Sequence, residues 1–403
     1  MATTKAKKVL YFVPEFPRRT ETFIQREIAK LIEFGNLDIQ VLSLQKASAE
    51  FYKGVEEVTC FKRLSLLLSI KALCFFIAKP AKVLQAFKLV MQDFTKNPIK
   101  RVYFFLKAVG YTKIIQDFHV DHIHAHFMSD PSTIAMVASI ILDIPFSVSG
   151  HAKDVFVEGT LVKEKAIRAK FVSVCNKAAY KKCKELAGDN ENIFMVYHGV
   201  DADYIANFVS DIQKPVRPYI FTQGRFVEKK GLEYLVEAAD ILKQQGVDFE
   251  MHIVGGGGHL YQKLVDLINQ KNLNDRVFIE GADKGVPYSQ VVSFYKTADM
   301  FVLPSLETGE GDADGVPTAV IEASLASLPI VTTAAGSITD LITDNKTGLI
   351  IPQRDAQAIA VAVNKLLADP DLGVTLGKNA CETAKEMFNM EENIGQLQRL
   401  LLL

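Results

Sequence analysis

Short apolar, β-branched runs alternate with helical patterns along almost the whole chain. The segments between the runs, such as 21–35 and 231–246, carry apolar residues at spacings of three and four, which is typical of amphipathic helices. Regular alternation of strands and helices predicts parallel, doubly wound α/β sheets with helices on both faces. The runs fall into two series, at 9–13, 39–44, 122–127, 146–150, 171–175 and 193–197, and at 219–224, 249–255, 276–281, 300–304, 329–333 and 347–352. Two series predict two Rossmann-like domains facing a central cleft.

The 403 residues provide enough chain for two or three domains, each with its own core. The segment 200–219 contains two prolines and little periodicity, so we expect the linker there. We therefore predict an N-terminal domain over 1–200 and a C-terminal domain over 201–383. Residues 384–403 are predicted to form a C-terminal helix that packs back toward the N-terminal domain. In α/β proteins the ligand lies at the carboxyl ends of the strands, which makes the cleft the expected site.

Composition indicates an ordinary globular protein of a reducing compartment. The formal net charge is −1, and the five cysteines show no paired CxxC spacing, which argues against a disulfide framework. The N-terminal segment lacks the apolar stretch and cleavage site of a signal peptide. The longest apolar run, 64–78, is shorter than a bilayer span and is interrupted by Lys71. We expect a cytoplasmic protein.

The segment 61–115 is strongly basic, with eleven Lys or Arg residues and a single acid, Asp93. Its apolar residues and lysines follow a helical spacing, as in amphipathic helices that lie on a membrane surface. Two interpretations remain: a solvated basic face, and a surface that binds anionic lipid on the inner face of the cell membrane. A nucleic-acid partner is not expected, because no zinc, helix-turn-helix or RNA-binding signature accompanies the charge.

Cations and glycines follow two strand-like runs of the second series. In "GRFVEKKG", Gly224 and Arg225 end the first run, and Lys230 comes five residues after Arg225. Two fixed cations at one strand end suit a diphosphate. The run "IVGGGG" places Gly255 and Gly256 at another strand end, where missing side chains allow close backbone approach to a phosphate or nucleotide. It is not a GxGxxG dinucleotide motif, since no helix and acidic partner follow at the required spacing.

The stretch "GDADGVPTAVIEASLASLPIVTT", residues 311–333, reads as an acidic loop, a helix and a strand. Pro317 suits the first turn of the helix, and free amides at such a terminus can hold an anion. Asp314 lies before this terminus and Glu322 more than one turn inside the helix. Alone, Asp314 fits a helix cap and Glu322 an exposed helix residue. Together with the cations and glycines, they indicate carboxylates that bind hydroxyls attached to the bound anion.

The order of these motifs, followed by "TGLII", resembles that of the retaining glycosyltransferases of family 4, which have the GT-B fold. The resemblance extends over nearly the whole chain. In the first half, "FPRRTETFIQREI", "DHIHAHF" and "SGHAKDVF" are similar to the subgroup that builds colanic acid and other exopolysaccharides.

The resemblance implies a role for each motif residue. Arg225 and Lys230 would bind the pyrophosphate of the donor, and Glu322 the ribose hydroxyls. Asp314 stands where the family usually has Glu and would touch the donor sugar, and His151 would face the transferring sugar. The implied catalytic residues are His151, Asp314, Arg225 and Lys230. The implied donor site comprises Gly224, Arg225, Lys230, Gly255, Gly256, Asp314, Gly315, Val316, Pro317, Thr318, Ala319 and Glu322.

The first half supplies the expected acceptor side. We predict acceptor contacts from Arg18, Glu21, Thr22, His126 and Asp154. His122, His124 and His126 alternate along one strand and share one face. This spacing could bind a metal, but a structural or acceptor-lining role is expected, and no metal cofactor is predicted.

The predicted function is transfer of a hexosyl group, with retention, from a nucleoside diphosphate sugar to a polysaccharide or lipid-linked glycan. Two alternatives remain: a GT-B nucleotide-sugar epimerase, and a non-catalytic nucleotide-sugar-binding protein. A glycosidase fits less well, because glycosidases place two carboxyl groups across the bond that is cut.

Overall fold

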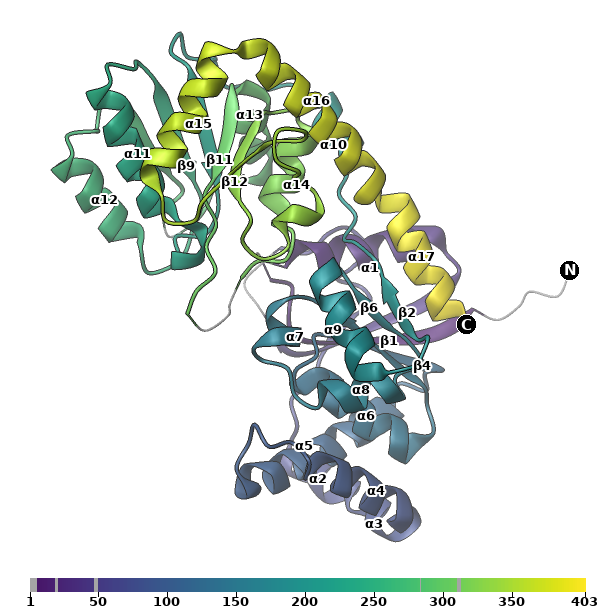
Figure 1. Cartoon of the computed structure of the whole chain (residues 1–403). Helices are drawn as coiled ribbons and strands as arrows, with labels where there is room; N and C mark the ends of the chain where they lie inside the picture. The colour runs from purple at the N-terminus through teal and green to yellow at the C-terminus, as the bar shows by residue number, and fades with distance from the viewer. Residues whose placement is uncertain (1–5, 19–20, 47–49, 283, 310–312) are drawn as a thin grey trace, which may run out of the picture. The chain divides into compact units, whose positions relative to one another are not determined.

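The computed structural model describes residues 6–18, 21–46, 50–282, 284–309 and 313–403. The chain forms two compact units (Figure 1). Unit 1 comprises Met1–Gly199 and Met390–Leu403, and unit 2 comprises Val200–Asn389. Each unit is built on one all-parallel sheet with helices on both faces, so the predicted pair of Rossmann-like α/β domains is confirmed.

The sheet of unit 1 has the strand order β3-β2-β1-β4-β5-β6-β7. The order reverses between β1 and β4, and ligands of doubly wound sheets bind at such a switch point. Strand β3 was not predicted, because three residues are too few to show an alternating pattern. The strands are β1 (Lys7–Phe16), β2 (Leu37–Lys46), β3 (Thr59–Phe61), β4 (His122–His126), β5 (Phe146–Gly150), β6 (Val172–Val174) and β7 (Ile193–Met195).

Alternate side chains of β1 pack into two hydrophobic cores, one on each face of the sheet. Tyr11 and its neighbours two residues away pack with α1 (Thr22–Phe34) and α17 (Met390–Leu402). Leu10 and Phe12 face the larger core on the opposite side of the sheet. That core includes side chains from α5 (Pro98–Gln116), α6 (Asp130–Leu142), α8 (Val162–Arg168) and α9 (Lys177–Ala187), and α7 (Lys153–Phe156) follows β5.

The basic segment forms α2 (Leu66–Ala72), α3 (Cys74–Ala78), α4 (Pro80–Val90) and all of α5 except its last residue. Phe75, Ala86 and Phe105 anchor these helices in the larger core. Many other apolar side chains of the segment are exposed: Leu66, Leu67, Ile70, Leu73, Phe76, Ile77, Leu84, Phe94, Ile99, Val102, Tyr103 and Leu106. Among the described residues, no helix is both long and apolar enough to cross a bilayer.

The sheet of unit 2 has the order β10-β9-β8-β11-β12-β13, with its switch point between β8 and β11. The strands are β8 (Tyr219–Gln223), β9 (Glu250–Val254), β10 (Val277–Glu280), β11 (Met300–Leu303), β12 (Ile330–Thr333) and β13 (Leu349–Ile351). The segment 200–219, predicted as a linker, contains the short helix α10 (Ala202–Asn207), whose six residues are too few for a periodic pattern.

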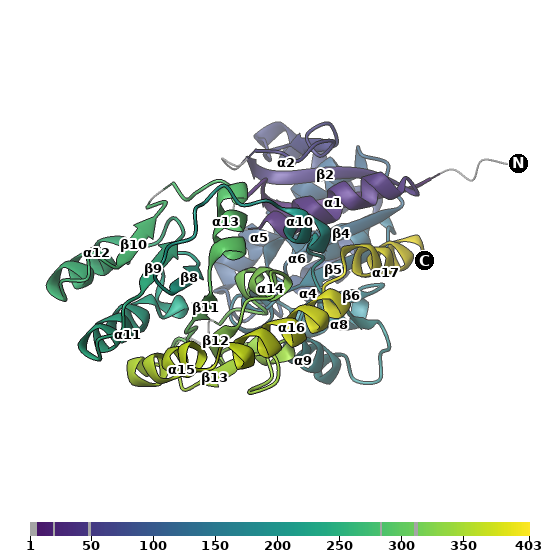
Figure 2. The same ribbon diagram turned by 90° about the horizontal axis from the view of Figure 1, so that it is seen from above.

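Helices cover both faces of the second sheet. On one face, α11 (Leu232–Gln244) lies between α12 (Tyr261–Gln270) and α15 (Ala356–Ala368) in both views (Figures 1 and 2). On the other face, Phe221 of β8 contacts Phe294 and Tyr295 of α13 (Tyr288–Thr297). Helices α14 (Thr318–Leu325) and α16 (Pro370–Met387) pack against each other.

Candidate functional site

At the switch point of unit 2, the loops that follow β8 and β11 contact each other. The N–H of Leu306, after β11, donates a hydrogen bond to the carbonyl of Lys229 over 2.8 Å. Gly231 has a φ of +64°, and a Cβ added there would lie 2.0 Å from the carbonyl oxygen of Pro304. Only glycine permits this backbone contact. The glycine after "KK" therefore fixes the two lysines beside the acidic loop.

Lys229, Lys230 and Asp314 form one lysine–aspartate cluster. Nζ of Lys230 lies 2.6 Å from Oδ2 of Asp314, and Nζ of Lys229 lies 3.3 Å from Oδ1. Burial alone would raise the pKa of the Asp314 carboxyl, but the two ammonium groups lower the pKa below its usual value. Asp314 is thus an ionised carboxylate held between two cations. Lys229 was not predicted, because sequence offered no reason to choose it as well as Lys230.

The glycines near this cluster allow neighbouring backbone segments to lie in direct contact. A Cβ on Gly255 would lie 1.9 Å from the carbonyl oxygen of Gly224, and one on Gly256 would lie 2.4 Å from the N atom of Gly285. The N–H of Gly224 donates to the carbonyl of Val254. Packing alone thus excludes side chains at Gly255 and Gly256. Close approach of a nucleotide to the backbone at these two glycines remains a prediction.

The remaining predicted donor residues lie around the start of α14. Pro317 is the N-cap residue, and its carbonyl accepts hydrogen bonds from the N–H groups of Val320 and Ile321. The amides of Thr318 and Ala319 therefore belong to the first turn, where helix geometry offers no intrahelical acceptor. Gly315 and Val316 are half-buried before the helix, whereas Arg225 is exposed after β8. Asp312 lies outside the described residues.

Glu322 is a buried carboxylate rather than an exposed helix residue, with 2% of its surface exposed. The hydroxyl of Tyr288 donates a hydrogen bond to its Oε1 over 2.9 Å. The Tyr288 ring stacks on Tyr204 at a centroid distance of 5.7 Å. Tyr288 was not predicted, because its link to Glu322 is a tertiary contact across 34 positions of sequence.

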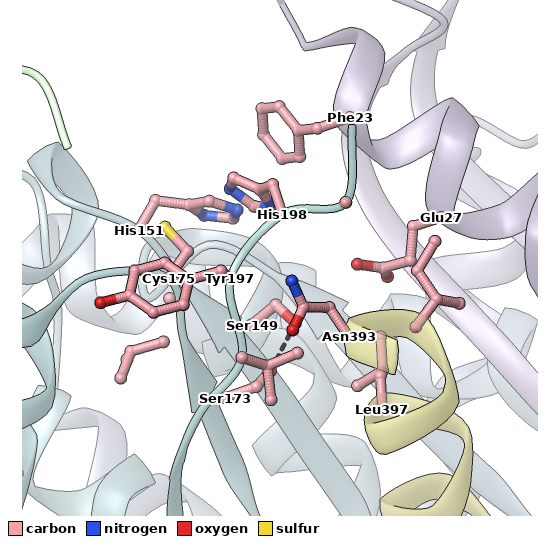
Figure 3. A pocket seen from close by; sticks show the side chains of 15 residues that line it. Phe23, Glu27, Ser149, His151, Ser173, Cys175, Tyr197, His198, Asn393 and Leu397 are labelled. Carbon is pink, nitrogen blue, oxygen red and sulfur yellow. Dashed lines mark hydrogen bonds between the residues drawn. The ribbon is translucent and has the colours of Figure 1, made fainter. Parts of the chain in front are cut away.

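Unit 1 has a small pocket of about 20 Å³ lined by residues of α1, β5, β6 and α17 (Figure 3). Above it, the rings of Phe23 and His198 stack at 4.1 Å, and His198 stacks on His151 at 5.1 Å. Burial lowers the pKa of His198 to about 3, so this ring is neutral at physiological pH. His151 is almost buried, and no described residue accepts or donates a hydrogen bond at either ring nitrogen. The pocket wall also includes Glu27, Ser149 and Ser173.

Asp154 connects two loops at this edge of the sheet. Its Oδ2 accepts the N–H of Met128 over 2.7 Å, and its Oδ1 accepts the N–H of His151 over 2.9 Å. Burial would raise the pKa of the Asp154 carboxyl, but these bonds and the nearby His151 ring lower it. This geometry suits a residue that positions His151 better than one that contacts an acceptor.

The other predicted acceptor residues divide by exposure. Thr22 begins α1, and just before it Nη1 of Arg18 donates to Oε1 of Glu21 over 2.9 Å. Burial raises the pKa of the Glu21 carboxyl. His126, in contrast, is fully buried, and its Nε2 lies 3.1 Å from Oε1 of Glu27.

Comparison with known proteins shows which protein family the segment containing this site is similar to. Residues 207–383 match the family model described as "Glycosyl transferases group 1". The chain is 26% identical to the putative colanic acid biosynthesis glycosyltransferase WcaL of Salmonella typhimurium, over 98% of this chain and 99% of that protein. It is 38% identical to the amylovoran biosynthesis glycosyltransferase AmsK of Erwinia amylovora, over 38% of this chain and 37% of that protein.

Solved structures agree on the fold. A glycosyltransferase from Rickettsia africae superposes with a TM-score of 0.73 at 17% identity, covering 98% of both chains. Anabaena Alr3699/HepE in complex with UDP gives a TM-score of 0.72 at 17% identity, covering 98% of this chain and 99% of that one. Residues 207–383, which contain the lysine–aspartate cluster, thus match the glycosyltransferase group 1 domain, and the chain has the fold of GT-B glycosyltransferases and is similar to proteins named for colanic acid and amylovoran biosynthesis.

Proposed function

We propose that the protein transfers a hexosyl group from a nucleoside diphosphate sugar to a polysaccharide or lipid-linked glycan, with retention of the anomeric configuration. The observation that carries this proposal is the lysine–aspartate cluster at the switch point of unit 2. Phosphates bind at such points in doubly wound sheets. The similar Anabaena protein binds UDP, which agrees with a diphosphate ligand.

The charges of the cluster suit a sugar nucleotide. Lys229 and Lys230 supply two cations, Arg225 a third, and Asp314 one anion, so the formal sum is +2. The diphosphate of a sugar nucleotide carries one negative charge on each phosphate. The start of α14 adds partial positive charge and free amides. The site can therefore neutralise the diphosphate with protein groups alone.

The proposed reaction breaks the bond between the sugar C1 and the diphosphate oxygen. The acceptor hydroxyl attacks C1 on the same face, and its proton passes to the departing phosphate oxygen. Lys230, Lys229 and Arg225 stabilise the charge that develops on that oxygen, and removing one such preorganised donor typically costs about 10²–10³-fold in rate. In this proposal Asp314 and His151 contact the transferring sugar, and Glu322 binds the ribose.

For the acceptor, we propose direct contacts from Arg18, Glu21 and Thr22. These residues precede or begin α1 and are not fully buried. Asp154 and His126 are buried, and we propose that they position the loops after β4 and β5. The stacked rings of Phe23, His198 and His151 offer apolar faces on which a sugar ring can lie.

We further propose that α2–α5 lie on the anionic cytoplasmic surface of the membrane. Leu66, Ile77 and Ile99 expose 79%, 87% and 83% of their surfaces, among eleven Lys or Arg residues. An exposed apolar surface of this extent marks an interaction site. Each lysine near an anionic surface adds about 1 kcal/mol of attraction.

The test is a screen of nucleoside diphosphate sugars by thermal shift, followed by assays with and without glycan acceptors. A ligand at 100 times its Kd stabilises the fold by about 2.7 kcal/mol. We expect one donor to bind and to give a product whose new anomeric proton, read by NMR, has the configuration of the donor. Conversion of the donor without acceptor would indicate an epimerase. Binding with every acceptor inert would indicate a non-catalytic protein, and an inverted product would refute retention.

A further inference from the structure

One carboxylate and two imidazoles meet beneath α1 in unit 1. His124 and His126 are two residues apart on β4, so both side chains leave the same face of the strand. Glu27 projects from α1, which covers that face. One ligand-capable atom from each of the three residues lies within 4.8 Å of the other two. Both histidines are fully buried.

We propose that Glu27, His124 and His126 bind a single divalent transition-metal ion, with Zn²⁺ as the expected occupant. Two imidazoles and one carboxylate, with a fourth position open to water, are a donor set of protein zinc sites. Imidazole nitrogen suits zinc, whereas Mg²⁺ and Ca²⁺ prefer oxygen ligands. The inference concerns unit 1 alone and does not rest on the proposed sugar transfer.

Groups around the three residues match the supporting shell of a metal site. The hydroxyl of Tyr11 donates to Oε1 of Glu27 over 2.9 Å. Nδ1 of His124 lies 2.7 Å from Oγ of Ser147, and its Nε2 lies 3.0 Å from Oγ of Ser149. Either nitrogen can bind a metal while the other keeps a serine, and such partners orient ligand rings in known sites.

His126 presents one ring nitrogen to Glu27 and leaves the other without a partner among the described residues. The first nitrogen is Nε2, and the second is the buried Nδ1. A buried polar nitrogen without a partner costs free energy. The ion would bind at Nε2, the nitrogen that already faces the Glu27 carboxylate, because a cation at Nδ1 would lie on the far side of the ring from Glu27.

A pocket lined by Glu27 provides room for a water molecule on the carboxylate side of the three residues. Glu27 and Ser149 both line the pocket of about 20 Å³, and the Glu27 carboxylate projects from α1 toward it (Figure 3). A space of that size holds about one water molecule. A water there would occupy the fourth position of a tetrahedral ion.

The chain offers a matched control on the same strand. His122 is also buried on β4, on the same face as His124, and its Nε2 lies 2.7 Å from Oγ of Ser147. It does not belong to the set of three ligands. His122→Gln therefore removes a buried β4 histidine and leaves the proposed ligands in place.

The experiment uses tag-free full chain, stripped with a chelator and dialysed against micromolar ZnCl₂, with bound metal measured by mass spectrometry. We expect one ion per chain in the wild type and in His122→Gln, and affinity lower by about 100-fold or more in Glu27→Gln and His126→Gln, since loss of a mere supporting partner costs 10–100-fold. Circular dichroism of the metal-free proteins checks folding. Equal zinc content in folded ligand variants, or no bound zinc in the wild type, would overturn the proposal.

Cobalt substitution of the wild type gives an answer that needs no variant. Four-coordinate Co²⁺ with nitrogen and oxygen ligands should show visible d–d bands without a sulfur-to-cobalt charge-transfer band. A charge-transfer band would assign the ion to one of the cysteines and refute the site. Absence of the four-coordinate d–d bands would refute it as well.

Discussion

Lys230 and Asp314 form a 2.6 Å ion pair across 84 positions of sequence. The pair joins the loop after β8 to the loop after β11, and Lys229 contacts the other oxygen of the same carboxylate. In the proposed donor site, the diphosphate shares these lysines with Asp314. The first two predictions concern this ion pair.

Replacing either lysine should weaken donor binding. We expect Lys230→Met to raise the Kd for UDP or GDP by about 10- to 100-fold, because a charge-assisted hydrogen bond contributes about 1.5–3 kcal/mol. Lys229→Met should raise it by less. Isothermal titration calorimetry measures both. Lys263→Met, on the exposed surface of α12, is the control and should change nothing. Wild-type affinity in both variants would refute the phosphate assignment.

Neutralising Asp314 should separate binding from turnover. Asp314→Asn removes the negative charge between the lysines, so we expect UDP or GDP to bind about 5-fold more tightly. The rate of transfer should fall by about 10²-fold or more, because the proposed contact with the sugar loses its charge. Titration calorimetry and steady-state kinetics measure the two effects. Weaker nucleotide binding in the folded variant would contradict this prediction.

Tyr288 should act through Glu322. In the proposed donor site, the hydroxyl of Tyr288 holds Oε1 of the carboxylate that binds the ribose hydroxyls. We expect Tyr288→Phe to raise the donor KM about 5-fold with little change in kcat, and to reduce the preference for UDP over 2′-deoxy-UDP. Glu322→Gln should reduce that preference further. If Tyr288→Phe weakened both nucleotides equally, its role would be general packing.

Exposed apolar residues of α2 and α3 should drive vesicle binding. We expect the triple change Leu66→Ser, Ile70→Ser and Ile77→Ser to lower partitioning onto anionic vesicles by about 10- to 100-fold, since each buried CH₂ is worth about 0.8 kcal/mol. Vesicle co-sedimentation measures this. The double change Val361→Ser and Val374→Ser, at exposed positions of unit 2, is the control.

Lysine substitutions between 71 and 107 should also weaken vesicle binding, and added salt should do the same. Unchanged partitioning would remove the membrane proposal.

Lys165 predicts a pH dependence of stability. It is fully buried, donates to the carbonyls of Met128 and Ser129, and burial lowers its pKa to about 7 from an ordinary 10.5. Between these values the unfolded chain binds more protons than the folded one, so the free energy of unfolding rises with pH. The gain is on the order of 1.4 kcal/mol per pH unit and levels off near pH 10.5.

The measurement compares denaturant unfolding of unit 1 in the wild type and in Lys165→Met from pH 6.5 to 9.5. Other titrating groups are common to both proteins, so the difference isolates Lys165. We expect the wild type to gain stability relative to Lys165→Met as pH rises. A constant difference would show that Lys165 titrates outside this range.

Sequence periodicity was sufficient for the fold because most of the buried strands are short runs rich in apolar residues, separated by helical patterns. It missed β3 and α10, because their three and six residues are too few to repeat a strand or helix pattern clearly. In the site, "GRFVEKKG" and "DGVPTAVIEA" identified Lys230, Asp314 and Glu322 because these residues lie beside glycines and a helix start. Contacts such as Tyr288–Glu322 and Glu27–His126 join distant segments, so no local pattern indicates them.

The packing of α17 on α1 bears on how the protein is made. Four residues of α17 complete an apolar layer whose other buried members, Ile24 and Ile28 among them, are translated before any of unit 2: Ile394, Leu397, Leu400 and Leu401. During synthesis, the apolar layer of unit 1 therefore stays exposed until α17 is translated. Unit 2, in contrast, contains all the residues of its own core. Chaperone contact during synthesis should therefore centre on α1 until α17 emerges.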